Sequence, residues 1–136
     1  MKTDKALWIF DWQVKERGKI DWLKAHTGFL RPLHRYEGEI RLKEGWIELL
    51  GKEVQTDRDY YLKIQKEDLV GTDLGYDDIF RRREDRSLGI GLTPLKIEYR
   101  EREKDRRLYL FVKFRRLTRT SKNREWFKEL MNWMTS

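Results

Sequence analysis

Two clusters of basic residues are the part of this sequence best suited to chemistry with a charged partner. The first cluster is Arg81, Arg82 and Arg83, and the second is Arg115, Arg116, Arg119 and Lys122. An arginine guanidinium binds phosphate through two parallel hydrogen bonds, so either cluster suits a phosphate group. Glu84 and Asp85 directly follow the first cluster, which favours a solvated, salt-bridged surface there. The second has no acidic residue before Glu125, so anion binding and a solvated surface both stay open for it.

Residues that could support catalysis or bind a metal are sparse. The two histidines, His26 and His34, lie eight positions apart, and no nucleophile motif accompanies them. Asp73, Asp77 and Asp78 lack the alternation and the final glutamate of a calcium loop, so turn formation explains them better. Cysteine is absent, which excludes a disulfide, a thiolate zinc site and a cysteine nucleophile. We therefore expect a noncatalytic protein that needs no metal or cofactor.

The composition is that of a folded, basic protein. The 136 residues are 38% hydrophobic, 13% aromatic and 40% charged, which provides enough apolar surface for one core. The net charge of +7 is uneven, because residues 1–36 contribute +4, residues 37–80 contribute −6 and residues 81–136 contribute +9. This asymmetry predicts a surface with two electrostatic poles, unless the fold interleaves these segments.

No segment is typical of a signal peptide or of a membrane helix. The apolar run from Ala6 to Phe10 is too short for the core of a signal peptide. No window approaches the roughly 18 apolar residues that a membrane span requires. Together with the absence of cysteine, this favours a cytoplasmic protein whose contact with a membrane, if any, is peripheral.

Hydrophobic periodicity predicts a meander of antiparallel strands. Apolar runs, several of them alternating, indicate strands at 36–42, 46–50, 60–64, 76–80, 95–99 and 108–114. Leu69-Val70 extends the apolar pattern before a turn that is predicted at Gly71-Thr72-Asp73. Glu44-Gly45 marks a hairpin turn, and residues 100–107 form a charged link before the last strand. The predicted fold class is mainly β, as an antiparallel barrel or a two-sheet roll.

The chain is predicted to end in an amphipathic helix over residues 121–134. Its apolar stripe has helical spacing and consists of Trp126, Phe127, Leu130, Met131, Trp133 and Met134. Ser121 or Asn123 is the expected N-cap, because short polar side chains accept hydrogen bonds from the first turn of a helix. We expect this helix to close one end of the barrel.

The N-terminal residues 1–35 are predicted to form an extension, with one strand and one helix packed on a core of residues 36–136. Both parts belong to a single domain. Three of the six tryptophans lie in this extension, namely Trp8, Trp12 and Trp22. Core packing is their expected use. The alternative is an arm through which Trp8 and Trp12 join two copies into a homo-oligomer.

The succession of elements resembles pleckstrin-homology-type domains, including the GRAM branch. The resemblance covers about residues 36–134, and its most specific point is Trp126, which is similar to the helix tryptophan common in that family. It implies a helix-capped barrel that binds phospholipid head groups or other proteins. Lipid-binding members have a basic series along the first hairpin. Here glutamates intervene between Arg41, Lys43 and Lys52, and their charge would oppose a multiply phosphorylated ligand.

These features predict a noncatalytic binding or adaptor module for an anionic partner, either a phosphorylated protein or an acidic lipid surface. The alternative is nucleic-acid binding through the basic C-terminal half. Tyr109, Phe111, Phe114 and Trp126 are the aromatic residues that could then stack on bases. Stacking requires Tyr109 and Phe111 to be exposed, whereas an N-terminal segment packed on the sheet would bury them.

Overall fold

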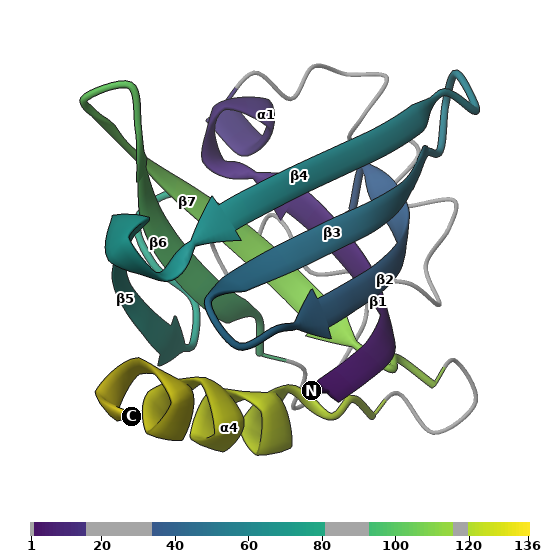
Figure 1. Ribbon diagram of the computed structural model, residues 1–136. Helices are drawn as coiled ribbons and strands as arrows, with labels where there is room; N and C mark the ends of the chain where they lie inside the picture. Colours follow the sequence, from purple (N-terminus) through teal and green to yellow (C-terminus); the bar gives the residue numbers. More distant parts are fainter. Residues whose placement is uncertain (1, 16–33, 81–92, 116–119) are drawn as a thin grey trace.

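The computed structural model describes residues 2–15, 34–80, 93–115 and 120–136 (Figure 1). They form one antiparallel sheet of seven strands in the order β4-β3-β2-β1-β7-β6-β5. The strands are β1 (Lys2–Phe10), β2 (Tyr36–Leu42), β3 (Trp46–Glu53), β4 (Asp59–Gln65), β5 (Leu69–Leu74), β6 (Leu95–Glu101) and β7 (Lys104–Val112). A short helix α1 (Asp11–Lys15) follows β1, and a 3-10 turn η1 (Lys66–Asp68) joins β4 to β5.

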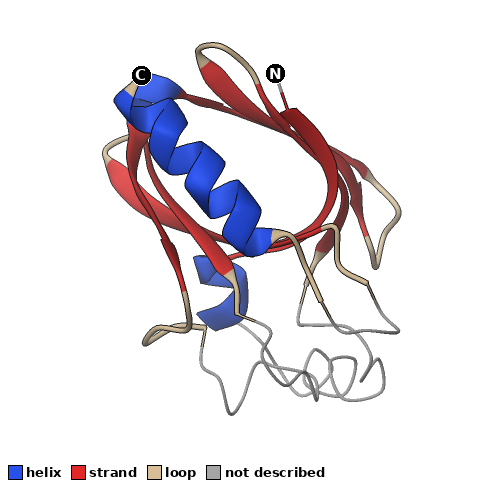
Figure 2. Cartoon of the chain, turned by 90° about the horizontal axis from the view of Figure 1, so that it is seen from below, coloured by secondary structure: helices blue, strands red, loops and turns tan. Residues whose placement is uncertain are grey.

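The sheet curls into a half-barrel, and helix α4 (Asn123–Thr135) lies across its opening, as Figure 2 shows. The predicted fold class, mainly β with a C-terminal helix, is confirmed. Only part of the predicted apolar stripe of α4 faces the barrel: Trp126 and Leu130 are fully buried, whereas Met131 is 44% exposed. The indole N–H of Trp126 also donates to Asp4 Oδ2 of β1 at 2.7 Å. The helix is thereby fixed to the strand farthest from it in the sequence.

Strand β1 lies at the centre of the sheet. Trp8 is opposite Tyr36 of β2 on one side and Leu110 of β7 on the other. The sequence predicted a strand here but placed it in an extension outside the 36–136 core. The difference arises because only the second half of β1, Ala6–Phe10, is apolar on both faces, and nothing local distinguishes such a short run in a central strand from one in a strand added at an edge.

Most other strands lie where the periodicity predicted them, with three differences. The turn predicted at Gly71–Asp73 is part of β5 instead, where these residues pair with β6. Tyr76–Phe80 is not a strand, because Asp77 Oδ1 accepts hydrogen bonds from the N–H groups of Ile79 and Phe80 at 2.9 and 2.8 Å and bends the chain. The charged link at 100–107 is instead the β6–β7 hairpin. Its two turn residues, Arg102 and Glu103, have φ of 49° and 68°, which is the backbone of a type I′ turn.

Asn123 does not cap α4 as predicted. The N-cap position belongs to Lys122, which makes no side-chain capping hydrogen bond. The Asn123 side chain is buried instead: its Oδ1 accepts from Val112 N–H at 2.7 Å, and its Nδ2 donates to the carbonyls of Thr93 and Leu110 at 2.7 and 2.9 Å. The side chain therefore serves the sheet rather than the first turn of the helix.

A second hydrophobic cluster covers the outer face of β1 and β7. Its buried members are Ile9, Val14, Phe80, Tyr109 and Phe111, with Leu7, Tyr76, Ile79 and Phe114 packed against them. Tyr109 and Phe111 are only 0% and 1% exposed, so they cannot stack on bases at the surface. Trp8 is likewise 0% exposed and offers no surface to a second copy. No helix in the described part of the chain is long and apolar enough to cross a membrane.

Candidate anion-binding surface

A groove of about 480 Å³ lies on the sheet where β7, β1 and β2 are neighbours. Its walls include Lys5, Leu7, Glu37, Glu39 and Lys113, and Phe111 and Phe114 add to its apolar part. The register explains the grouping, because Lys5 is opposite Glu39 and Leu7 is opposite both Glu37 and Phe111. Residues from three distant stretches of sequence thus line one depression.

The two lysines of the groove are held next to each other by the backbone. Lys113 N–H donates to the carbonyl of Lys5 at 2.7 Å, immediately after the last residue of β7. Lys113 has φ of 49°, a left-handed conformation that is uncommon for a residue other than glycine. Among the described residues, neither Lys5 nor Lys113 forms an ion pair. Both ammonium groups therefore remain available to an added anion.

The carboxylates in the same groove already have partners. Glu39 Oε2 accepts from Arg41 Nε and Nη2 at 3.3 and 3.1 Å. Glu37 Oε1 lies 3.1 Å from His34 Nε2. Two lysines and two glutamates line the groove, so their formal charges cancel. Because Arg41 offsets the charge of Glu39, the electrostatic potential in the groove is more favourable to an anion than this count suggests.

The basic residues predicted from the sequence fall into three groups. Arg115 is exposed, and its backbone N–H donates to Thr120 O at 2.8 Å, while its side chain has no ion pair within the described residues. Lys122 Nζ lies 3.7 Å from Glu125, which also contacts Lys2 at 3.8 Å. Outside the described residues lie Arg81, Arg82, Arg83, Arg116 and Arg119. Among the predicted residues that the structure describes, Arg115 is the nearest in sequence to the groove residue Lys113.

The excess positive charge of the protein is concentrated in three sequence segments. The described residues include 21 basic and 20 acidic side chains, whereas residues 16–33, 81–92 and 116–119 have a net +2 each. The described residues that lead into these segments include Val14, Phe80 and Phe114, and all three belong to the outer cluster on β1 and β7. Described residues close in sequence to each of the three basic segments therefore lie on one face of the sheet.

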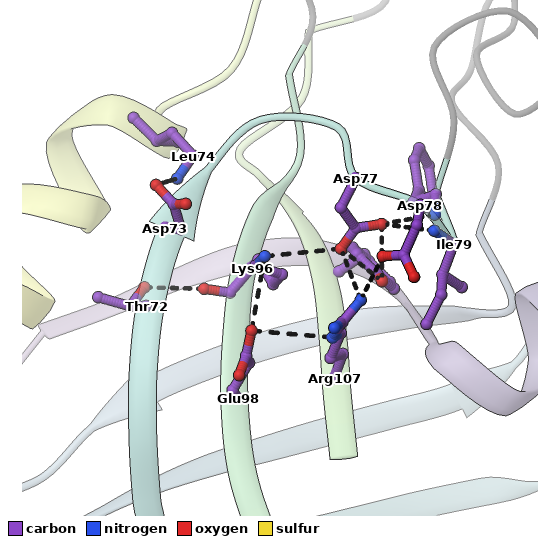
Figure 3. A network of polar contacts seen from close by, with 11 residues as sticks. Thr72, Asp73, Leu74, Asp77, Asp78, Ile79, Lys96, Glu98 and Arg107 are labelled. Atoms are coloured by element: carbon purple, nitrogen blue, oxygen red, sulfur yellow. Dashed lines mark hydrogen bonds and ion pairs between the residues drawn. The ribbon is translucent and has the colours of Figure 1, made fainter. Parts of the chain in front are cut away.

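Asp77, which accepts a hydrogen bond from the N–H of Phe80, belongs to an ion-pair network. Figure 3 shows this network around Asp77 and Arg107. Arg107 Nη1 donates to Asp78 Oδ1 at 2.8 Å and to Asp77 Oδ2 at 3.3 Å, and Lys96 Nζ lies 3.6 Å from the same Asp77 oxygen. Glu98 contacts both cations, at 3.5 and 3.7 Å. The hydrogen bond from Arg107 holds the pKa of Asp78 below its ordinary value.

The same network contains a buried phenol. Tyr109 O–H donates to Asp77 Oδ2 at 2.9 Å. Burial, followed by this hydrogen bond, raises the pKa of Tyr109, so it stays protonated at neutral pH. Asp77 also accepts hydrogen bonds from the backbone of a turn, and both aspartates pair with basic side chains. These contacts give the network a structural role, which agrees with the prediction that the aspartates form a turn.

Sequence reasoning missed Lys5 and Lys113. Lys5 lies near the start of β1 beside Asp4, and Lys113 is a single lysine just beyond β7, so neither belongs to a basic cluster. Only the β1–β7 pairing brings these opposite ends of the sequence together. Comparison of the chain with protein-family models, with curated proteins and with solved structures gives no match.

Proposed function

We propose that this protein is a noncatalytic binding module of pleckstrin-homology-like architecture that recognises an anionic partner. The order of the seven strands and the closing helix support the architectural part of this proposal. The single observation behind the functional part is the groove in which Lys5 and Lys113 have no acidic partner among the described residues.

The groove suits a ligand that combines a phosphate with an apolar portion. Lys5 and Lys113 line the same groove, and an ammonium group donates charge-assisted hydrogen bonds to a phosphate, whose charge at neutral pH is about −1.5 to −2. Leu7 and Phe114, both half-buried, supply an apolar wall beside them. A phosphorylated side chain and an acidic lipid head group share this chemistry. Arg115, with the nearby sequence positions Arg116, Arg119 and Lys122, would extend the attraction beyond the groove.

The test is a binding titration of the purified protein at several salt concentrations. The probes are phosphatidylserine vesicles, phosphatidylcholine vesicles and a phosphoserine peptide with its unphosphorylated twin. We expect the K5A/K113A variant to bind the preferred anionic probe at least about tenfold more weakly, equivalent to about 1.4 kcal/mol. The matched control is K104A/K128A, which removes two exposed lysines elsewhere.

The probe that binds identifies the class of anionic partner. Salt-sensitive binding to phosphatidylserine vesicles alone supports a membrane-surface partner, and selective binding of the phosphopeptide supports a phosphorylated protein. Equal affinities of K5A/K113A and K104A/K128A would contradict the groove as the site. Binding to nucleic acid alone, with a steep salt dependence, would contradict the proposal and support nucleic-acid binding instead. That binding would use phosphate contacts, because Tyr109 and Phe111 are buried and cannot stack on bases.

A further inference from the structure

The sheet has two edges, and they differ in regularity. Strand β5, at one edge, has a register shift between Leu69 and Gly71, and such irregularities discourage further strand pairing. Strand β4, at the other edge, pairs with β3 without interruption from Asp59 to Gln65 and contains no proline or glycine. Figure 1 shows β4 as the outermost strand on its side of the sheet. It is the edge better suited to receive another strand.

Alternate residues of β4 direct their backbone groups away from β3. Lys66 N–H donates to Gly45 O, and Arg58 O accepts from Glu53 N–H, so both of these residues face β3. Because backbone groups alternate along an antiparallel strand, the even-numbered residues between them face β3 as well. The N–H and C=O groups of Asp59, Tyr61 and Lys63 therefore point to the free edge.

The side chains of the same three residues form an exposed row of aspartate, tyrosine and lysine. Tyr61 is 54% exposed, one of the largest exposed apolar side chains among the described residues, and Asp59 and Lys63 are exposed as well. Tyr61 O–H donates to Glu48 Oε2 at 3.0 Å, and Lys63 Nζ lies 4.5 Å from the centre of the Trp46 ring. These contacts hold the row on the outer face of the sheet.

We propose that β4 pairs antiparallel with β4 of a second copy, about a twofold axis through Tyr61. In this register Asp59 of each copy lies opposite Lys63 of the other, and the two Tyr61 residues face each other. Each opposed pair can exchange two N–H···O bonds, because its backbone groups point to the free edge. Opposite charges and paired aromatic rings are both favourable when directly across a strand pair.

The charges also select this register over its neighbours. An axis through Lys63 would place lysine against lysine, and an axis through Asp59 would place aspartate against aspartate. With an axis through Tyr60 or Leu62, Asp59 of one copy would not lie opposite Lys63 of the other. Only the axis through Tyr61 matches both charges at once, as a self-complementary twofold interface requires. This edge is separate from the groove on β7, β1 and β2, so the inference does not depend on the proposed function.

The test is a charge exchange followed by measurement of mass in solution. A strand-to-strand interface is at the weak end of the range, so light scattering and sedimentation should span about 10 μM to 1 mM protein. We expect the wild type to dimerise over this range, and D59K and K63D each to be monomeric. The matched controls E129K and K128D, which make the same charge reversals at exposed positions of α4, should dimerise like the wild type.

Mixing the two monomeric variants provides the decisive measurement. D59K has lysine at both positions and K63D has aspartate at both, so together they should form a heterodimer detectable by native mass spectrometry. The double variant D59K/K63D should likewise recover the homodimer. A wild type that stays monomeric up to 1 mM, a single variant that still dimerises, or a mixture without heterodimer would each overturn the proposal. Circular dichroism and tryptophan fluorescence verify that every variant is folded.

Discussion

At the scale of single residues, Asn123 shows how one polar side chain can join a helix to a sheet. It is 3% exposed and uses its donor and acceptor groups on three backbone partners in β7 and in the segment before β6. Local sequence reasoning favoured a capping role, because asparagine at the start of a helix usually caps it. The sequence could not predict the observed role, because only the fold brings Asn123 next to its backbone partners Val112, Leu110 and Thr93.

We predict that Asn123→Ala destabilises the protein by about 3 kcal/mol. The substitution leaves the buried N–H of Val112 and the carbonyls of Thr93 and Leu110 without this partner, and an unsatisfied buried group costs about 1–3 kcal/mol. Urea unfolding followed by tryptophan fluorescence measures the change. Arg124→Ala, at the exposed neighbouring position, is the control and should change the unfolding free energy by less than about 0.5 kcal/mol. Similar values for the two variants would contradict the assigned role of Asn123.

At the same scale, the candidate site was only partly predictable. Arg115 was found because it lies in a run of basic residues, which composition alone reveals. Lys5 and Lys113 could not be found in this way, since their proximity depends on the backbone bond between them and on the pairing of β1 with β7. The engagement of Glu39 by Arg41 was equally invisible, although it decides the charge balance of the groove.

At the scale of elements, β2 and β3 approach each other closely at a pair of glycines. Gly38 and Gly51 are directly opposite in the register. A Cβ atom on Gly38 would overlap the carbonyl oxygen of Leu50, and one on Gly51 would overlap that of Glu37. The obstacles are backbone atoms, which cannot rotate away as a flexible side chain would, so glycine is required on steric grounds at both positions.

We predict that Gly38→Ala destabilises the protein by about 1–3 kcal/mol, the usual cost of overpacking. Gly45→Ala is the matched control, because no atom lies within 4 Å of its added methyl group and its φ is not in the left-handed region. Thermal unfolding followed by circular dichroism compares them. A Gly38→Ala variant as stable as Gly45→Ala would show that the two strands can separate without loss.

Elements were predictable where a local pattern determines them. The apolar stripe of α4 and the alternation of β2 and β6 each report burial on one face, which a helical or strand period reveals directly. The β6–β7 turn was missed because Arg102 and Glu103 adopt positive φ without glycine or asparagine, the residues that normally signal such a turn. Tyr76–Phe80 was mistaken for a strand because the hydrogen bonds that the Asp77 side chain accepts from Ile79 N–H and Phe80 N–H are not visible in periodicity.

At the scale of the whole molecule, burial decreases from the middle of the sheet towards its edges. The central strands β1 and β7 are covered on one face by the barrel core and on the other by the outer cluster. Every described residue of the edge strands β4 and β5 except the buried Ile64 is half-buried or exposed. The sequence could not order the strands in this way, because apolar runs of similar length occur in central and edge strands alike.

This gradient predicts the pattern of amide hydrogen exchange. The N–H groups of Ala6 to Trp8, in a stretch paired on both sides, should exchange only through global unfolding, since opening the middle of the sheet disrupts both clusters. Within β4, the strand supplies its own control: Tyr60 and Leu62 face β3 and should be protected, whereas Tyr61 should exchange freely in dilute protein. Raising the concentration should protect Tyr61 as copies pair, and it should leave Tyr61 of the D59K variant unprotected. Equal protection of neighbouring β4 amides at every concentration would contradict both the assigned direction of the edge groups and the pairing built on it.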